Sequence, residues 1–320
     1  MGSQLFEVPI SFHIFNRPEV TKIVFDEIRK IKPKKLFITA DGARRGNPDD
    51  EAKCQKTREI VSKIDWDCDL YKNFSDTNKG SFKSTSEGIT WVFSHVDRAI
   101  ILEDDCIPHC SFFTFCSELL EYYEKDTRIA LISGNNFQLG TNKTKESYYF
   151  SRYTHIWGWA TWKRTWEQVD FSMKAWPEYK EINGLRSSFF NKKEIGHWRG
   201  IYQEMFDKKR RLHWDYLLSL ASYMNNTVTI LPNVNLVSNV GFGPDASNCK
   251  VKGRFQSLEV KGLSFPLKHP NFVCTFVDAD DFTEKNIFSG TKSPWLNLVL
   301  KFIPNILYLK LRKLKRFIKC

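Results

Sequence analysis

Three consecutive carboxylates, Glu103, Asp104 and Asp105, directly follow the apolar run from 99 to 102. Like charges repel and an unpaired buried charge is costly, so carboxylates at the end of a buried strand call for a cation. Mg²⁺ and Mn²⁺ prefer hard oxygen ligands, typically one or two protein carboxylates together with the phosphate oxygens of a nucleotide. The triplet therefore predicts a Mn²⁺ or Mg²⁺ site beside a nucleotide, and a solvated acidic turn is the alternative interpretation.

Two further polar segments stand where apolar runs end. Arg17 closes the run that begins at residue 8, and Asp41-Gly42 closes the run from 36 to 39. An arginine fork matches the geometry of phosphate oxygens. Asp-Gly is also an ordinary turn. In "NKGSFKS", Lys79 and Lys83 lie at a predicted helix start, where they face either phosphates or solvent.

Asp215, in the segment "HWDY", is the candidate general base. A transferase that inverts a sugar's anomeric carbon needs one carboxylate to take the proton of the attacking acceptor hydroxyl. The alternative is a carboxylate in the first turn of a helix, which the helix dipole favours without any catalysis.

The segment "YTHIWGWATWKRTW" contains four of the ten tryptophans. Aromatic side chains are usually core residues, but the flat C–H faces of sugars also stack on aromatic rings. We expect a division in which Trp157, Gly158 and Trp159, with Trp214, line the side of the site that receives the acceptor.

These residues must be positioned by an alternation of strands and helices. Apolar, strand-like runs end near residues 17, 41 and 105, and 68–74 is a plausible further strand. Each is followed by a stretch with helical spacing, at 18–31, 49–64, 81–96 and 111–126. Such alternation predicts an α/β fold with a mostly parallel sheet and helices on both faces. Ligands then bind beyond the carboxyl ends of the strands. Later segments are less regular: 129–134 indicates a strand, 212–224 a helix, and 227–243 a strand pair or a strand and loop.

Composition limits the number of domains, the cellular location and the role of the cysteines that we expect. A chain of 320 residues with 42% hydrophobic residues can bury a core as one large or two small domains. We expect neither a secretory signal nor a transmembrane anchor. Eight scattered cysteines indicate reduced thiols in a cytoplasm. A zinc site at "CIPHC" is disfavoured because the second half of a four-ligand set is missing.

The formal charge of +11 is concentrated at the C-terminus. Seven Lys or Arg and no acid fall within 301–320, which leaves only +4 on the rest of the chain. This distribution argues against a nucleic-acid partner. Apolar residues at helical spacing among these cations predict a basic amphipathic tail that is too charged to span a bilayer and binds an anionic membrane surface. A helix packed on its own domain is the alternative.

Five motifs in order resemble the GT-A-fold nucleotide-sugar glycosyltransferases, closest to the N-acetylglucosaminyltransferase I type and its bacterial relatives, over roughly residues 8 to 250. They are "FNRP", "ITADG", "AIILEDD" with "FFTFCSELLEYY", "THIWGWATWKRTW" and "HWDY". The resemblance implies that Asp105 is the direct metal ligand and that Asp104 lies near the ribose or the metal's water shell. It implies a supporting role for Glu103, a diphosphate contact for Arg17, a uracil contact for Asp41 and the base role for Asp215.

One position departs from the family pattern. In "NVGFGPDASNCK", Asn248 occupies the likeliest place for a histidine that family members often carry near the donor. An amide is a poorer metal ligand than imidazole, so this sequence lacks the family's third protein ligand at that position.

The sequence thus predicts a metal-dependent, inverting glycosyltransferase, hexosyl- or N-acetylhexosaminyl-transferring, that uses a nucleotide sugar, most simply a UDP-sugar. A saccharide or lipid-linked acceptor in cell-surface polysaccharide or glycolipid synthesis follows from the bacterial relatives. We expect a GT-A domain over 1–290, with a nucleotide-binding half at 1–110 and an acceptor half at 111–290. A membrane-associating tail would occupy 291–320, on the cytoplasmic face of the cytoplasmic membrane. A sugar-phosphate nucleotidyltransferase and a non-catalytic basic adaptor for membranes or nucleic acid are the rivals.

Overall fold

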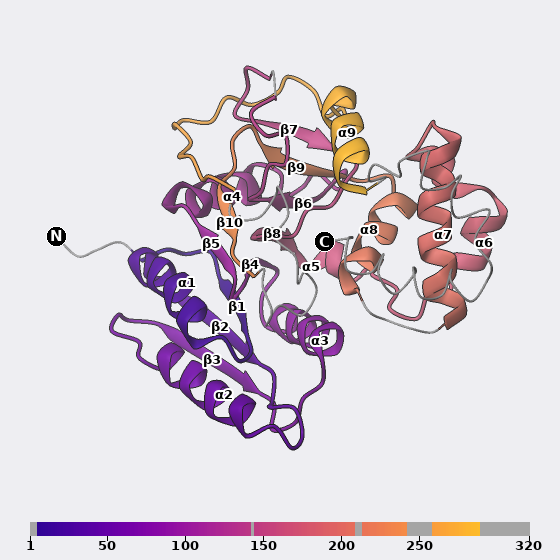
Figure 1. Ribbon diagram of the computed structural model, residues 1–320. Coiled ribbons are helices and arrows are strands. Elements are labelled where there is room, and N and C mark those ends of the chain that lie inside the picture. Colours follow the sequence, from indigo (N-terminus) through magenta and orange to yellow (C-terminus); the bar gives the residue numbers. More distant parts are fainter. Residues whose placement is uncertain (1–4, 142–143, 209–212, 242–257, 289–320) are drawn as a thin grey trace.

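An eight-stranded sheet forms the centre of the molecule (Figure 1). The computed structural model describes residues 5–141, 144–208, 213–241 and 258–288. Six strands run parallel to one another, while β8 and β7 run antiparallel to their neighbours. Across the sheet, the strands are ordered β3 (Asp69–Phe74), β2 (Lys35–Ala40), β1 (Ile10–Ile14), β4 (Arg98–Glu103), β8 (Trp159–Trp162), β6 (Ile129–Ser133), β9 (Val228–Pro232) and β7 (Tyr148–Ser151).

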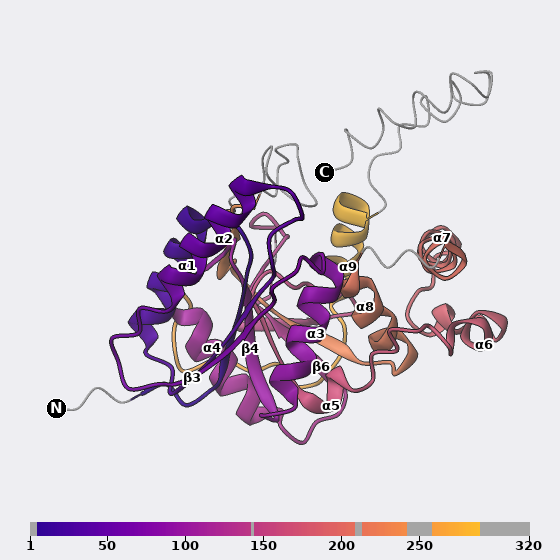
Figure 2. The same ribbon diagram turned by 90° about the horizontal axis from the view of Figure 1, so that it is seen from below.

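Helices cover both faces of this sheet (Figure 2). One face carries α1 (Pro18–Ile31), α2 (Pro48–Val61) and α4 (Cys110–Tyr122), and the other carries α3 (Ser81–Phe93) and α8 (Trp214–Met224). The remaining helical elements are α5 (Lys163–Trp166), α6 (Trp176–Glu181), the 3₁₀ turn η1 (Gly184–Ser187), α7 (Lys192–Lys208), α9 (Val277–Thr283) and the π-helical turn η2 (Glu284–Phe288).

The central strand β4 shows why the apolar runs form a buried sheet. Ile100 and Leu102 pack into the core on the α1 side, whereas Ala99 and Ile101 pack into the core on the α3 side. A strand buried on both faces reads as a continuous apolar run, as expected for a parallel sheet between two helical layers. The predicted α/β fold with a mostly parallel sheet is confirmed.

The pairing register of β1, β2 and β4 brings the polar residues at the ends of these strands together. His13 on β1 pairs with Thr39 on β2 and with Glu103 on β4, so the carboxyl ends of these three strands lie at one level. A separate two-stranded ribbon joins β5 (Cys106–Pro108) to β10 (Val237–Asn239), and it places Asn239 opposite Cys106. The segment after the triplet is thereby fixed against a residue more than a hundred positions away in the sequence.

Sequence patterns missed β7 and β8, which both lie in the aromatic-rich region. Trp159–Trp162, expected only as part of an aromatic-rich region, forms β8 and inserts between β4 and β6. Residues 227–243 contain two strands, β9 and β10, but these belong to different sheets. No helix of the described residues is long and apolar enough to cross a membrane. The predicted basic tail at 291–320 lies outside the described residues.

Candidate active site

A cavity of about 820 Å³ opens at the carboxyl ends of β1, β2 and β4, under the first turns of α3 and α8. Most of the predicted site residues line it. They are Arg17, Asp41, Lys83, Glu103, Asp104, Asp105, Trp157, Trp214 and Asp215. Gly158 and Trp159 are not among the lining residues. Segments separated by as many as two hundred positions in the sequence therefore contribute to one cavity.

Arg17 lies against the carboxylate triplet. Its Nη1 donates to Asp105 Oδ2 at 2.9 Å, and its Nη2 forms an ion pair with Asp104 Oδ1. The backbone N–H of Phe15 donates to the second oxygen of Asp104 at 3.2 Å. The short connection from β1 (ending at Ile14) to α1 (beginning at Pro18) thus holds Arg17 over the end of β4.

Negative charge exceeds positive charge in this cluster. Burial, together with repulsion from Asp105 and Asp104, raises the pKa of Glu103, which makes no side-chain hydrogen bond within the described residues. Burial also raises the pKa of Asp104, although Arg17 opposes this shift. Three carboxylates therefore face one guanidinium, and a further cation would stabilise all of them in the ionised form.

These residues fit a divalent metal that is completed by a ligand. Among the described residues, no three His, Cys, Asp or Glu side chains converge as a ready-made metal cage. Mg²⁺ and Mn²⁺ usually need only one or two protein carboxylates when phosphate oxygens supply the rest. Asp105 meets that requirement because its side chain is 13% exposed at the cavity wall, whereas that of Asp104 is 3% exposed.

Asp41 organises the loop that leads into α3. Its two carboxylate oxygens accept hydrogen bonds from the backbone N–H groups of Gly42, Lys79 and Gly80 and from the side-chain amide of Asn78. The side chain is 4% exposed. Asp41 lines the cavity where a nucleobase contact was predicted. The four bonds also give it the loop-forming role that was the alternative interpretation of Asp-Gly.

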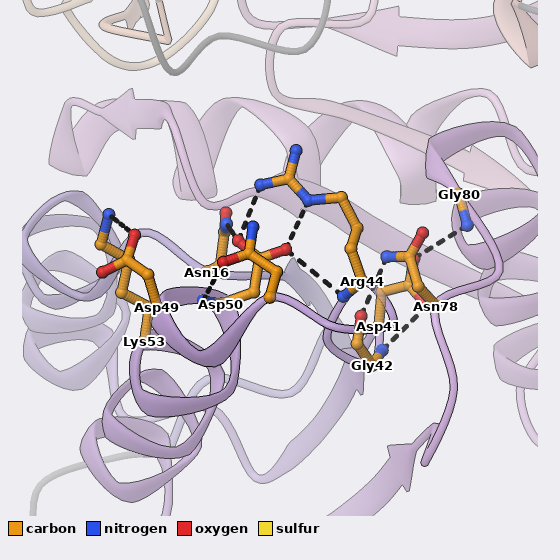
Figure 3. Close-up of polar contacts among 10 residues, drawn as sticks. Asn16, Asp41, Gly42, Arg44, Asp49, Asp50, Lys53, Asn78 and Gly80 are labelled. Atoms are coloured by element: carbon orange, nitrogen blue, oxygen red, sulfur yellow. Dashed lines mark hydrogen bonds and ion pairs between the residues drawn. The ribbon is translucent and has the colours of Figure 1, made fainter.

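A second buried carboxylate, Asp50, is bound to Arg44, which lines the cavity (Figure 3). It accepts two hydrogen bonds from the Arg44 guanidinium and one, of 2.7 Å, from the Asn16 amide. The Arg44 side chain, mainly through its hydrogen bonds, lowers the pKa of Asp50 to about 2. Sequence reasoning missed Arg44, although "DGARRG" directly after a strand end was a signal for a cation near phosphates.

Asp215 lies in the first turn of α8 and is half-buried at the cavity wall. Burial raises its pKa, and the neighbouring His213 opposes this rise. Glu103 and Asp215 line the same cavity, and repulsion from Asp215 adds to the rise in the pKa of Glu103. A raised pKa makes Asp215 a stronger proton acceptor once it is ionised, as a general base requires.

The aromatic residues divide between the cavity and the core. Trp157 is half-buried, lines the cavity and packs edge-on against Phe137 at 4.8 Å between ring centroids. Trp159 is only 1% exposed, and its ring stacks at 5.8 Å on Trp214, which does line the cavity. Trp159 therefore supports the wall from behind rather than presenting a face to the cavity.

Gly158 has a clear backbone role. Its φ of +63° lies in the left-handed region, and a Cβ at this position would come within 2.8 Å of Val237 Cγ2. Glycine therefore allows the chain to turn between Trp157 on the cavity and Trp159 in the core.

Lys83 and Lys79 both pair with Glu87 on α3. The Lys79 Nζ lies 2.9 Å from Glu87 Oε2 and the Lys83 Nζ lies 3.6 Å from Glu87 Oε1. Lys83 is exposed and also lines the cavity. Its predicted donor contact stays a prediction.

Asn239 and Gly241 were also missed by sequence reasoning. The Asn239 side-chain amide donates to Asp105 Oδ1 at 3.3 Å, and the Gly241 backbone N–H donates to Asn239 Oδ1 at 2.8 Å. A Cβ on Gly241 would collide with the Asp105 carboxylate at 1.8 Å. No local pattern reveals these contacts, because only the β5–β10 pairing creates them. Asn248, the predicted departure, lies outside the described residues.

No family model and no curated protein matches this chain. Solved structures are similar at low identity. The mannosyltransferase PcManGT from Pyrobaculum calidifontis, in complex with GDP-Man and Mn²⁺, is 11% identical over 52% of this chain and 47% of its own, with a TM-score of 0.34. Mouse xyloside xylosyltransferase 1, in the apo form, is 12% identical over 69% and 84%, with a TM-score of 0.34.

The inositol-1-phosphate CTP transferase from T. maritima is 8% identical over 72% of this chain and 86% of its own, with a TM-score of 0.35. The chain spans about half the length of the mannosyltransferase. These three neighbours are named as sugar or nucleotide transferases. At such identities and TM-scores they carry no argument about the reaction of this chain, which must be argued from the cavity itself.

Proposed function

We propose that the chain is a glycosyltransferase that moves a sugar from a nucleotide sugar, most simply a UDP-sugar, to a hydroxyl acceptor, with inversion at the anomeric carbon. One observation carries this proposal. One wall of the cavity carries the carboxylate triplet with Arg17, which suits a metal-bound diphosphate. The same cavity is lined by a separate half-buried carboxylate, Asp215, which suits deprotonation of an acceptor.

The donor side of the cavity is the triplet with Arg17. The guanidinium forks towards oxygens of Asp104 and Asp105, and the same fork geometry can bind diphosphate oxygens. A Mn²⁺ or Mg²⁺ ion held by Asp105, when bound, would neutralise the charge that develops on the departing diphosphate. Glu103 and Asp104 would keep that end of the cavity negative and thus select for a metal-loaded nucleotide.

The acceptor side is the start of α8 with Trp157. Asp215 would take the proton of the acceptor hydroxyl while the oxygen attacks the anomeric carbon from the side opposite the diphosphate. Trp157 and Trp214 would present ring faces to an acceptor saccharide. A hexosyl or N-acetylhexosaminyl transfer to a saccharide or lipid-linked acceptor in cell-surface polysaccharide or glycolipid synthesis remains our proposal.

Structural features argue against both rivals. A sugar-phosphate nucleotidyltransferase usually cradles phosphates in a glycine-rich loop after its first strand, but here only residues 15–17, without glycine, connect β1 to α1. A role as a non-catalytic adaptor does not explain why the carboxylate triplet and Asp215 line one cavity.

The test is a donor panel with the full chain. The purified protein is incubated with Mn²⁺, candidate saccharide acceptors and UDP-, GDP- and CMP-linked sugars, and free nucleotide is scored. Nucleotide release that requires a UDP-sugar and metal, with a β product from an α-linked donor, is expected. Release of pyrophosphate from a nucleoside triphosphate and a sugar phosphate would instead identify a nucleotidyltransferase and overturn the proposal.

A further inference from the structure

The connection from residue 182 to residue 193, between α6 and α7, exposes large apolar side chains. Phe190 is 83% exposed and Ile182 is 70% exposed. Their neighbours Phe189 and Leu185 are buried at 0% and 4% exposure, respectively. Phe189 and Leu185 therefore anchor the connection in the core, and this holds the exposed Phe190 and Ile182 in place. Exposed apolar groups on a fixed support are typical of an interaction surface.

Cations without acids accompany these apolar side chains. Residues 182–193 include Arg186, Lys192 and Lys193 but no Asp or Glu. All three cations are exposed, and none makes an ion pair with another described residue. Lys192 and Lys193 also begin α7, where the helix dipole disfavours positive charge. Helix stability therefore does not account for them, whereas an external anionic partner would.

The connection is packed beside the last described residues of the chain. Phe189 and Phe288 contact the same two rings, those of Tyr153 and Trp198, with centroid distances between 4.9 and 6.0 Å. Arg152 also links the two segments. It donates to the Ser188 carbonyl at 3.1 Å and, from Nε, to Asp280 on α9 at 3.0 Å.

This packing places the connection next to α9 and η2, the last described elements of the chain. Phe288 immediately precedes residues 289–320, whose last twenty residues carry seven cations and no acid. In Figures 1 and 2, α6 and α7 lie at one side of the molecule, next to α8. The 182–193 connection and the last described residues of the chain thus belong to one region of the molecule.

We propose that the 182–193 connection is a contact surface for an anionic lipid membrane. Phe190 and Ile182 enter the boundary between headgroups and acyl chains, and Arg186, Lys192 and Lys193 lie against lipid phosphates. This surface does not depend on the transfer chemistry proposed above.

Cosedimentation of the full chain with vesicles tests the surface. Vesicles of phosphatidylcholine with phosphatidylserine are compared with phosphatidylcholine alone at low salt, and the partition coefficient is measured for the parent, Phe190→Ser and Lys192→Gln with Lys193→Gln. The parent is expected to bind the anionic vesicles selectively. Phe190→Ser should lower the partition coefficient by about tenfold. The lysine pair should lower it by about five-fold for each cation removed.

Matched variants exclude a general effect of hydrophobicity or charge. Phe272→Ser removes a phenylalanine that is 74% exposed elsewhere. Lys63→Gln with Lys125→Gln removes the same charge from two other exposed positions. Both controls should bind vesicles like the parent, and UDP binding should be unchanged in every variant. Unchanged vesicle binding by Phe190→Ser and by the lysine pair would overturn the proposal. A changed sedimentation coefficient without vesicles would instead identify an interface between copies of the chain.

Discussion

Two clusters in this molecule each combine one arginine with three carboxylates, and they differ in what surrounds the charges. Arg17 contacts Asp104 and Asp105 and lies near Glu103 on the wall of a cavity. Arg152 contacts Asp280 and Glu194, and Glu284 lies nearby, bonded to the Tyr153 hydroxyl at 2.7 Å. In the Arg17 cluster the Glu103 side chain accepts no hydrogen bond from another described residue.

In the Arg152 cluster, Asp280 is saturated by the protein. Ser151 Oγ donates to one oxygen, and the backbone N–H and Nε of Arg152 donate to the other at 3.1 and 3.0 Å. Burial raises the pKa of Asp280 as it does that of Asp104, so a shifted pKa alone does not distinguish the two sites. Unused acceptor capacity beside an open cavity distinguishes a binding site from a buried structural network.

The largest expected effect is on turnover. Asp215→Asn keeps the shape of the side chain but cannot accept a proton, so transfer should fall by about two to four orders of magnitude. UDP affinity and the unfolding midpoint should stay close to those of the parent. Steady-state rates with the true acceptor and calorimetry with UDP measure the two quantities, and Asp207→Asn, at an exposed position on α7, is the control. Near-parental turnover in Asp215→Asn would require a different base.

The Arg152 cluster should respond to mutation in stability rather than in binding. Asp280→Asn leaves Arg152 buried without its main partner, which should lower the free energy of unfolding by about 3–5 kcal/mol. Asp278→Asn on the exposed side of the same helix should change it by less than about 0.5 kcal/mol. Chemical denaturation measures both. Equal stabilities of the two variants would show that the Arg152 cluster is not the structural network described here.

Asp50 provides a third comparison, which concerns how the stability of the protein depends on pH. Its pKa is about 2 in the folded protein because of Arg44, below the usual value of about 3.9, so its contribution to stability is complete above about pH 4 and is lost as the pH falls towards 2. Arg44 is largely exposed, and solvent screening limits the contribution to roughly 1–2 kcal/mol. The parent should therefore lose more stability between pH 5 and pH 2.5 than Asp50→Asn does. Parallel pH profiles of the two proteins would contradict this assignment.

The smallest expected effect concerns metal-dependent nucleotide binding. Mn²⁺ should strengthen UDP binding by about tenfold relative to EDTA, and Asp105→Ala should abolish this difference because the bridging carboxylate is gone. Asp67→Ala at an exposed position is the control. Because the triplet is an excess of like charge, Asp105→Ala should not lower the unfolding midpoint as Asp280→Asn does. Calorimetry that gives equal UDP affinity with and without Mn²⁺ in the parent would exclude the metal site.

Sequence patterns predicted the first half of the fold because its contacts follow the chain. A helix follows each strand from β1 to β4 along the chain, after the short β5 in the case of β4. Of these strands, β1, β2 and β4 are apolar runs, and the residues of the donor side follow or end them. The second half depends on contacts that no local pattern encodes. Trp159 was expected near the acceptor, but its place in β8 between β4 and β6 buries it. Asn239 reaches Asp105 only through the β5–β10 ribbon.

The position of β8 has a consequence for how the chain can be divided. β8 pairs antiparallel with β4 through Arg98↔Trp162 to Ile101↔Trp159, so the strand that carries the triplet is completed by residues about sixty positions later. A fragment that ends near residue 110 would leave one edge of β4 unpaired, with bare backbone donors and acceptors along an apolar strand that invites aggregation. During synthesis the nucleotide-binding half must therefore wait for β8 to emerge before its central sheet closes. In a circular permutant whose new ends lie between β4 and β8, β8 is synthesised first and must wait for β4 instead.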